Sequence, residues 1–141
     1  MQIRSRSTYE VRIYLGSVNE ETKKAFSKDD LIREVGLYQE SQPQKIPLRI
    51  TETVFVCETH YEETGWELAA INYPRIETGS KNIDDFMIKL ASYLLDVFGQ
   101  RRISIVMPLE TLMLERYDEG KRFKWGREKL ETIVPHSKKQ R

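Results

Sequence analysis

A polar stretch at residues 71–75 carries side chains of the types that bind small ligands. Its sequence is Ile-Asn-Tyr-Pro-Arg, and Pro74 ends a strand there because proline has no backbone N–H to donate. Asn72, Tyr73 and Arg75 are therefore expected at the rim of a sheet, where polar side chains can face a ligand. Arginine offers a planar fork of donors to a carboxylate or phosphate, and tyrosine offers a flat surface to a base or sugar.

Arg12 and Tyr14 belong to a predicted strand and can approach this stretch across the sheet. Both share the strand face opposite Val11 and Ile13. The alternative is an ordinary exposed sheet face with cross-strand pairs of Arg, Tyr, Thr and Glu, which the residue types do not exclude. We predict a binding site for a small anionic ligand, such as a nucleotide, formed by Arg12, Tyr14, Asn72, Tyr73 and Arg75.

Cys57 and His60 have the C-x-x-H spacing of some zinc sites. On a strand, residues an odd number apart point to opposite faces, so this pair needs a bend in the chain to converge. A solvated acidic loop and a buried structural thiol are the alternatives for these two residues. We predict no metal and no cofactor, with Cys57 and His60 as the candidates if a metal does bind.

Motifs of nucleophilic catalysis and of phosphate binding are missing from the sequence. It contains no G-x-S-x-G and no G-x-x-x-x-G-K-[ST], and its seven glycines are scattered singly. A non-catalytic binding module is therefore our first hypothesis. The alternative is a small enzyme on a dimeric α+β barrel, with His60 or a Tyr–Glu pair as the acid or base.

Residues 121–129 interleave basic and aromatic side chains, as proteins that bind single-stranded nucleic acid do. The candidate contacts are Arg122, Lys124, Trp125 and Arg127. Acidic neighbours and a pI near 7.8 argue against a dedicated nucleic-acid protein. An adaptor that binds nucleic acid or protein through this segment is a further alternative.

Length and charge indicate one domain with basic ends. The 141 residues suit a single core. Residues 1–7 carry a net charge of +2 and residues 116–141 one of +5, which leaves −6 for residues 8–115. We predict a basic arm, an α+β domain and a partly ordered basic tail with these boundaries. One cysteine, no apolar N-terminal stretch and no run of membrane-spanning length favour the cytoplasm.

Hydrophobic periodicity predicts the first two elements that position these residues. Residues 8–15 alternate apolar and polar side chains, which indicates a half-buried strand. A helix is expected to begin at Lys28, because Ser27 and Asp30 have the spacing of a capping box. It should end before Pro43.

Residues 48–58 and 66–73 are rich in β-branched and aromatic side chains and predict a long hairpin. Gly65 suits the turn between its strands. The hairpin, and an open sheet face with Tyr14 and Phe55, would expose apolar surface if left uncovered. We therefore predict a closed homo-oligomer, either a trimer or a dimer.

The second predicted helix has the strongest apolar periodicity in the chain. Ser80 or Asn82 can cap it, and Asp84 and Asp85 are expected in its first turn, where they complement the helix dipole. Gly99 is a fitting C-terminal stop.

The remaining residues predict shorter elements. Residues 101–107 read as a strand, and residues 109–115 as either a strand or a single helical turn. Residues 126–133 permit a short docking helix, followed by a disordered end.

The order strand, helix, hairpin, helix, strand predicts a ferredoxin-like βαββαβ sandwich. This fold has a four-stranded antiparallel sheet with two helices on one face, and here an extra C-terminal segment. The predicted core comprises Val11, Ile13, Leu31, Val35, Ile50, Val54, Val56, Leu68, Ala70, Phe86, Leu90, Leu94, Ile103 and Ile105.

This pattern over residues 8–115 resembles that of PII-like and CutA-like trimeric proteins, although no glycine-rich nucleotide loop of the PII proteins is present. The chain is also similar to small uncharacterised proteins of bacteria and their phages. The similar segments are Y-E-V-R-I-Y at residues 9–14, I-N-Y-P-R at 71–75 and P-x-x-T-x-M-L-E at 108–115. The resemblance implies a fold and no particular activity.

Overall fold

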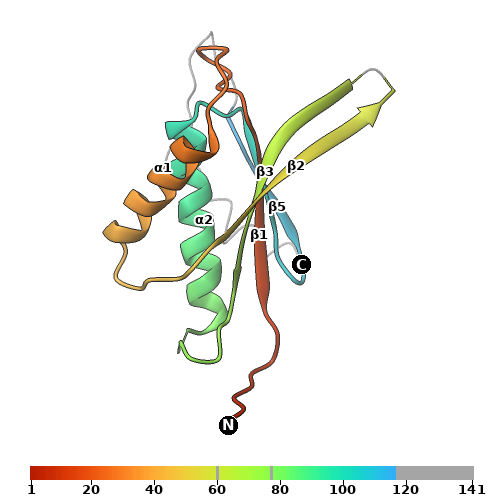
Figure 1. The fold of residues 1–141 in the computed structure, drawn as a ribbon. Coiled ribbons are helices and arrows are strands. Elements are labelled where there is room, and N and C mark those ends of the chain that lie inside the picture. Colours follow the sequence, from red (N-terminus) through yellow and green to blue (C-terminus); the bar gives the residue numbers. More distant parts are fainter. Residues whose placement is uncertain (60, 77, 117–141) are drawn as a thin grey trace.

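The computed structural model describes residues 1–59, 61–76 and 78–116. The elements are β1 (Glu10–Gly16), α1 (Lys28–Ser41), β2 (Arg49–Glu58), β3 (Tyr61–Ile71), α2 (Ser80–Val97), β4 (Arg102–Val106) and β5 (Thr111–Glu115). The strands form one antiparallel sheet in the order β2-β3-β1-β4-β5, and both helices lie on one face of it (Figure 1). The α+β class is confirmed, whereas the prediction of four strands is wrong.

The fifth strand, β5, lies in residues 109–115, the segment for which the sequence allows either a strand or a single helical turn. Leu112 and Leu114 are buried on the helix side of the sheet, opposite Ile105 and Ile103 of β4. Five alternating residues are too few to identify a strand from their period alone. The free edge of β4 supplies the hydrogen-bonding partner that makes this segment a strand.

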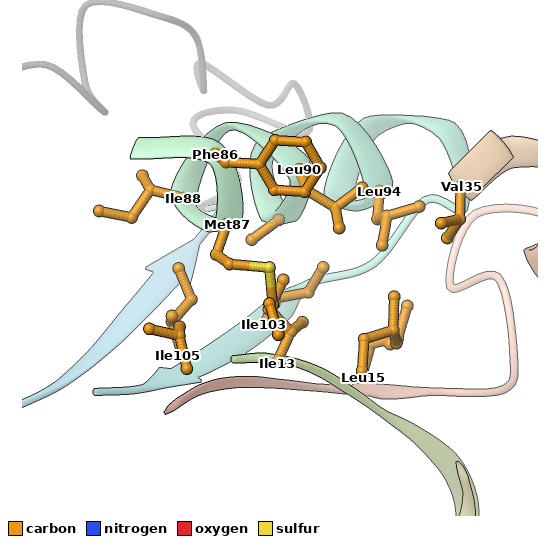
Figure 2. Close-up of a cluster of buried hydrophobic side chains, with 14 of the residues drawn as sticks. Ile13, Leu15, Val35, Phe86, Met87, Ile88, Leu90, Leu94, Ile103 and Ile105 are labelled. Atoms are coloured by element: carbon orange, nitrogen blue, oxygen red, sulfur yellow. The ribbon is translucent and has the colours of Figure 1, made fainter. Parts of the chain in front are cut away.

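The core lies between α2 and the sheet (Figure 2). Met87, Leu90 and Leu94 of α2 face the sheet side chains Ile13 and Ile103, and all five are almost fully buried. Among the described residues, neither helix is long and apolar enough to cross a membrane.

The core prediction is wrong for two residues of β2. Val54 and Val56 are 52% and 69% exposed, and Ile50 is half-buried. The reason is that the β2–β3 hairpin extends past the end of β1 and away from the helices, so that no other described element covers its far half (Figure 1). The other predicted core residues are buried.

The start of α1 is as predicted, and the start of α2 is not. The Ser27 hydroxyl accepts from the backbone N–H of Asp30, whose carboxylate accepts in turn from the Ser27 N–H. These bonds lower the pKa of Asp30. The N-cap of α2 is Gly79, which makes no side-chain capping bond, so the prediction of Ser80 or Asn82 is wrong.

The acidic residues placed in the first turn of α2 lie beyond it. The Asp84 carboxylate instead accepts a hydrogen bond from the Tyr9 hydroxyl at 2.7 Å, which ties the helix to the residue before β1. Asp85 pairs with Lys81 at 3.0 Å on the helix surface. The predicted stop is correct, because Gly99 follows α2 with a φ of +53°.

Gly65 does not form the hairpin turn. The strands reverse between Glu58 and Tyr61, and Gly65 lies inside β3, between Gly16 of β1 and Thr53 of β2. A Cβ at Gly65 would lie 2.5 Å from the Leu15 carbonyl oxygen and 2.5 Å from the Phe55 ring. This glycine therefore permits close approach of a neighbouring strand and ring rather than a turn.

Several predictions fall outside the described residues. They concern His60, the docking helix at 126–133, the disordered end and the candidate nucleic-acid contacts Arg122, Lys124, Trp125 and Arg127.

Candidate functional site

The open face of the sheet brings two of the predicted ligand residues together. A guanidinium nitrogen of Arg12 lies 3.4 Å from the Tyr14 hydroxyl, which donates to the Glu67 carboxylate at 2.7 Å. The bond to Glu67, and then burial, raise the pKa of Tyr14. Tyr14 also packs edge-on against Phe55, with ring centroids 6.0 Å apart.

Neighbouring charges on this face pair with one another. Arg49 of β2 lies 2.9 Å from the Glu10 carboxylate and 4.0 Å from that of Glu67. Arg12 lies 3.7 Å from Glu10. Two arginines and two glutamates thus balance each other across three strands. The face resembles the cross-strand pairing that was the alternative to a ligand site.

The other three predicted residues follow β3. The Asn72 side chain accepts from the Tyr9 backbone N–H at 2.8 Å and donates to the Ser7 carbonyl, so it joins the start of β1 to the end of β3. Tyr73 is half-buried, and Arg75 is exposed in the turn after β3. A ligand site at these residues stays a prediction.

A cleft of about 450 Å³ opens at the opposite end of β1, beside the base of the projecting hairpin. Three segments that are distant in the sequence line it: the end of β1 with the following loop, the start of β3, and the start of β4. The lining residues are Gly16, Val18, Glu20, Tyr61, Glu62, Glu63, Gln100, Arg101 and Arg102.

Glu63 is an exposed lining residue of this cleft whose carboxylate is held on both sides. The Tyr61 hydroxyl donates to one of its carboxylate oxygens at 2.7 Å, and this bond raises the pKa of Tyr61. The other oxygen lies 2.5 Å from the point where a Cβ on Gly16 would stand. Gly16 therefore leaves room for the carboxylate, because any larger residue would occupy the same space.

The cleft has charges of both signs. Glu20, Glu62 and Glu63 line it together with Arg101 and Arg102. Arg102 pairs with Glu115 of β5 at 2.5 Å, and Arg101 is exposed. Such a lining suits a ligand that carries a positive and a negative group.

The sequence prediction missed this cleft. The sequence allows a Tyr–Glu pair as an acid or base, but it predicts a turn at residues 60–65. The available signal was the two-residue spacing of Tyr61 and Glu63, which places both side chains on one face of a strand. Gly16 and Gln100 gave no such signal, since their role depends on strand pairing.

The Cys57 half of the metal candidate is exposed, rather than a buried structural thiol. Within residues 1–59, 61–76 and 78–116, no three His, Cys, Asp or Glu side chains are grouped so as to hold a metal ion.

No protein-family model and no curated protein matches the chain. Two solved structures are similar in fold. One is a phage SAM lyase in complex with S-methyl-5'-thioadenosine, with a TM-score of 0.59 and 11% identity over 82% of this chain and 95% of that chain. The other is a phage SAM lyase in the apo state, with a TM-score of 0.54 and 13% identity over 84% and 92% of the two chains. At these identities the likeness shows a shared fold.

Proposed function

We propose that the cleft beside the hairpin binds S-adenosylmethionine and that the protein is a lyase that releases S-methyl-5'-thioadenosine from it. The fold likeness to a phage SAM lyase that binds this thioadenosine supports the proposal, because the match covers 95% of that chain. The volume of about 450 Å³ lies within the usual range for small-molecule sites.

The observation that carries the proposal is the Glu63 carboxylate, which lines the cleft, accepts a hydrogen bond from Tyr61 and lies close against Gly16. S-adenosylmethionine has a positively charged sulfur, an ammonium group and a carboxylate. Glutamates in the cleft attract the sulfonium and ammonium groups, and the exposed Arg101 attracts the carboxylate. This differs from the anionic ligand that the sequence predicted.

The proposed reaction breaks the bond between the sulfonium sulfur and the amino-acid side chain. The bonding electrons stay on sulfur, which leaves as the neutral thioether of S-methyl-5'-thioadenosine. The carbon that loses sulfur is either attacked by the substrate's own carboxylate or forms a double bond when a base removes a neighbouring proton. In the second route we assign the base to Glu63.

We favour the cleft over the open face as the ligand site because the charges of the open face are already matched. Arg12 and Arg49 both lie within ion-pair distance of Glu10. A ligand there would have to displace these pairs. The Arg12, Tyr14, Asn72, Tyr73 and Arg75 site therefore becomes the second choice.

We also propose that the protein forms a homo-oligomer through the projecting hairpin. Val54, Val56 and Tyr61 are each about half exposed or more, and β2 is an edge strand. An exposed apolar edge strand is a favourable surface for pairing with another chain. A second copy on the hairpin would also lie beside the cleft, which Tyr61 lines.

For the fold, we infer a ferredoxin-like unit with an added fifth strand. The strand order β2-β3-β1-β4 and the position of both helices on one face support this. The resemblance to PII-like and CutA-like proteins stays a prediction.

The test of the function uses the purified full chain. Isothermal titration calorimetry measures binding of S-adenosylmethionine, and chromatography with mass spectrometry follows S-methyl-5'-thioadenosine above a protein-free control. We expect saturable binding and release of the thioadenosine. Binding without release would replace the lyase with a non-catalytic binding module, and no binding would overturn the proposal.

A further inference from the structure

Gln100, a lining residue of the cleft, connects three parts of the chain. Its side-chain oxygen accepts from the Gly16 backbone N–H at 3.1 Å, and its side-chain nitrogen donates to the carbonyls of Val18 at 2.9 Å and Phe98 at 3.2 Å. The residue is 4% exposed. Both amide hydrogens are thus used within the protein, and neither is left for a ligand.

The loop that Gln100 contacts comprises residues 17–26 and has backbone hydrogen bonds of its own. The Phe26 N–H donates to the Ser17 carbonyl at 2.9 Å, and the Asn19 N–H donates to the Lys24 carbonyl at 2.9 Å. These cross-links make the loop one cooperative unit. Glu20, which lines the cleft, belongs to this unit.

The same loop makes two further contacts with residues at the end of α2 and directly after it. The Glu20 N–H donates to the Gly99 carbonyl at 3.0 Å, and the rings of Phe26 and Phe98 stack with centroids 4.0 Å apart. Gly99 has a φ of +53°, and a Cβ there would overlap the Asn19 side chain. The loop therefore packs closely against residues 98–100, the segment that carries Gln100.

Gln100 also adjoins Glu63. The Gln100 and Glu63 side-chain oxygens lie 3.5 Å and 2.5 Å from the same point, the Cβ position of Gly16, and so stand within about 6 Å of each other. Glu63 of β3 and Glu20 of the loop both line the cleft. Gln100 bonds both the end of β1, at Gly16, and the start of the loop that carries Glu20, at Val18.

We infer that Gln100 is a positioning residue that sets the loop of residues 17–26, and with it Glu20, at the separation from Glu63 that a ligand with a positive group requires. This inference rests on the proposed function and adds to it the residue that determines the width of the acidic side of the cleft. Gln100 acts through the backbone and does not itself contact the ligand.

The test replaces Gln100 with methionine, which has a similar volume and cannot make the three hydrogen bonds. Calorimetry with S-adenosylmethionine gives both the dissociation constant and the fraction of binding-competent chains. We expect Gln100→Met to weaken binding about tenfold with an unchanged stoichiometry, since displacement of one side of a site costs affinity in every molecule. If the variant shows turnover, KM should rise while kcat is retained.

Gln39→Ala is the matched control. The Gln39 side chain also bonds a loop carbonyl, that of Ile46 at 2.8 Å, but lies outside the lining of the cleft. It should lower the melting temperature and leave the dissociation constant unchanged. Gln100→Asn, which keeps the amide on a shorter side chain, serves if Gln100→Met does not fold.

Three outcomes separate the possibilities. An unchanged dissociation constant with a lower stoichiometry would show that Gln100 only maintains the fold, and would overturn the inference. If the unmodified chain binds and the Gln100 variants bind equally well, this inference fails and the proposed function stands. If the unmodified chain does not bind, the proposed function fails and the inference fails with it.

Discussion

One carboxylate oxygen of Glu63 lies 2.5 Å from the position that a Cβ on Gly16 would occupy. Gly16 pairs with Gly65 in the sheet and not with Glu63, and the two residues are far apart in the sequence. Glu63 belongs to the projecting hairpin (Figure 1), and it lines the cleft together with Gly16 at the end of β1. The proposed function depends on this contact, and the first two predictions address it.

Glu63→Gln should weaken binding of S-adenosylmethionine by roughly 10- to 100-fold, because a hydrogen-bonded charge contributes about 1.5–3 kcal/mol. Titration calorimetry measures the effect. Glu52→Gln is the matched control, since Glu52 is an exposed glutamate of the same hairpin that does not line the cleft. Equal loss of affinity in both variants would point to net charge rather than to the position of Glu63.

Gly16→Ala should reduce the affinity while leaving the fold intact. The added Cβ meets the end of a flexible side chain, which can move aside at little cost, but the carboxylate then leaves its place. Gly36→Ala is the control, because a Cβ there meets nothing within 4 Å. It should stabilise α1 by up to about 1 kcal/mol without an effect on binding. Denaturant unfolding and calorimetry distinguish the two; full affinity in Gly16→Ala would argue against the cleft.

The stability of the protein should fall in alkali because of Tyr38. Its hydroxyl donates to the Phe86 carbonyl at 2.8 Å, and burial raises its pKa above the ordinary value of 10.0. The folded state therefore retains this proton where the unfolded state has lost it. The contribution is complete below pH 10 and is lost as the pH rises through the folded-state pKa.

Tyr38→Phe tests this directly. At neutral pH it should cost about 1 kcal/mol, because the hydrogen bond from the Tyr38 hydroxyl to the Phe86 carbonyl is lost. Above pH 10 the difference in unfolding free energy between the two proteins should shrink. Urea unfolding at pH 7 and above pH 10 provides the measurement, and a constant difference would contradict the role of Tyr38.

Val56→Lys should convert the proposed homo-oligomer into monomers. Val56 is 69% exposed near the tip of the hairpin, where a charge on an edge strand discourages pairing with another chain. Native mass spectrometry and light scattering report the subunit number. Ile32→Lys is the control, since Ile32 is 48% exposed on α1, away from the hairpin. A monomeric unmodified chain would contradict the proposal.

Residues close in the sequence determined much of the fold. The capping box of Ser27 and Asp30, the stop at Gly99 and the alternation of β1 were all predictable, because hydrogen bonds and burial within a helix or strand follow from a local period. The start of α2 was not, since Gly79 caps it without any side-chain bond. The exposure of Val54 was not predictable either. Val54 lies outside the core because the hairpin extends beyond the helices.

What the sequence alone determined is the class of the fold and most of the elements, since each depends on residues a few positions apart. The tertiary structure decided where chemistry can occur. Glu63 reaches Gly16 only because β3 pairs with β1 in one register, and Gln100 reaches both Gly16 and Val18 only because α2 ends beside that strand. A strand register is set by burial over the whole sheet, so no local pattern in the chain contains it.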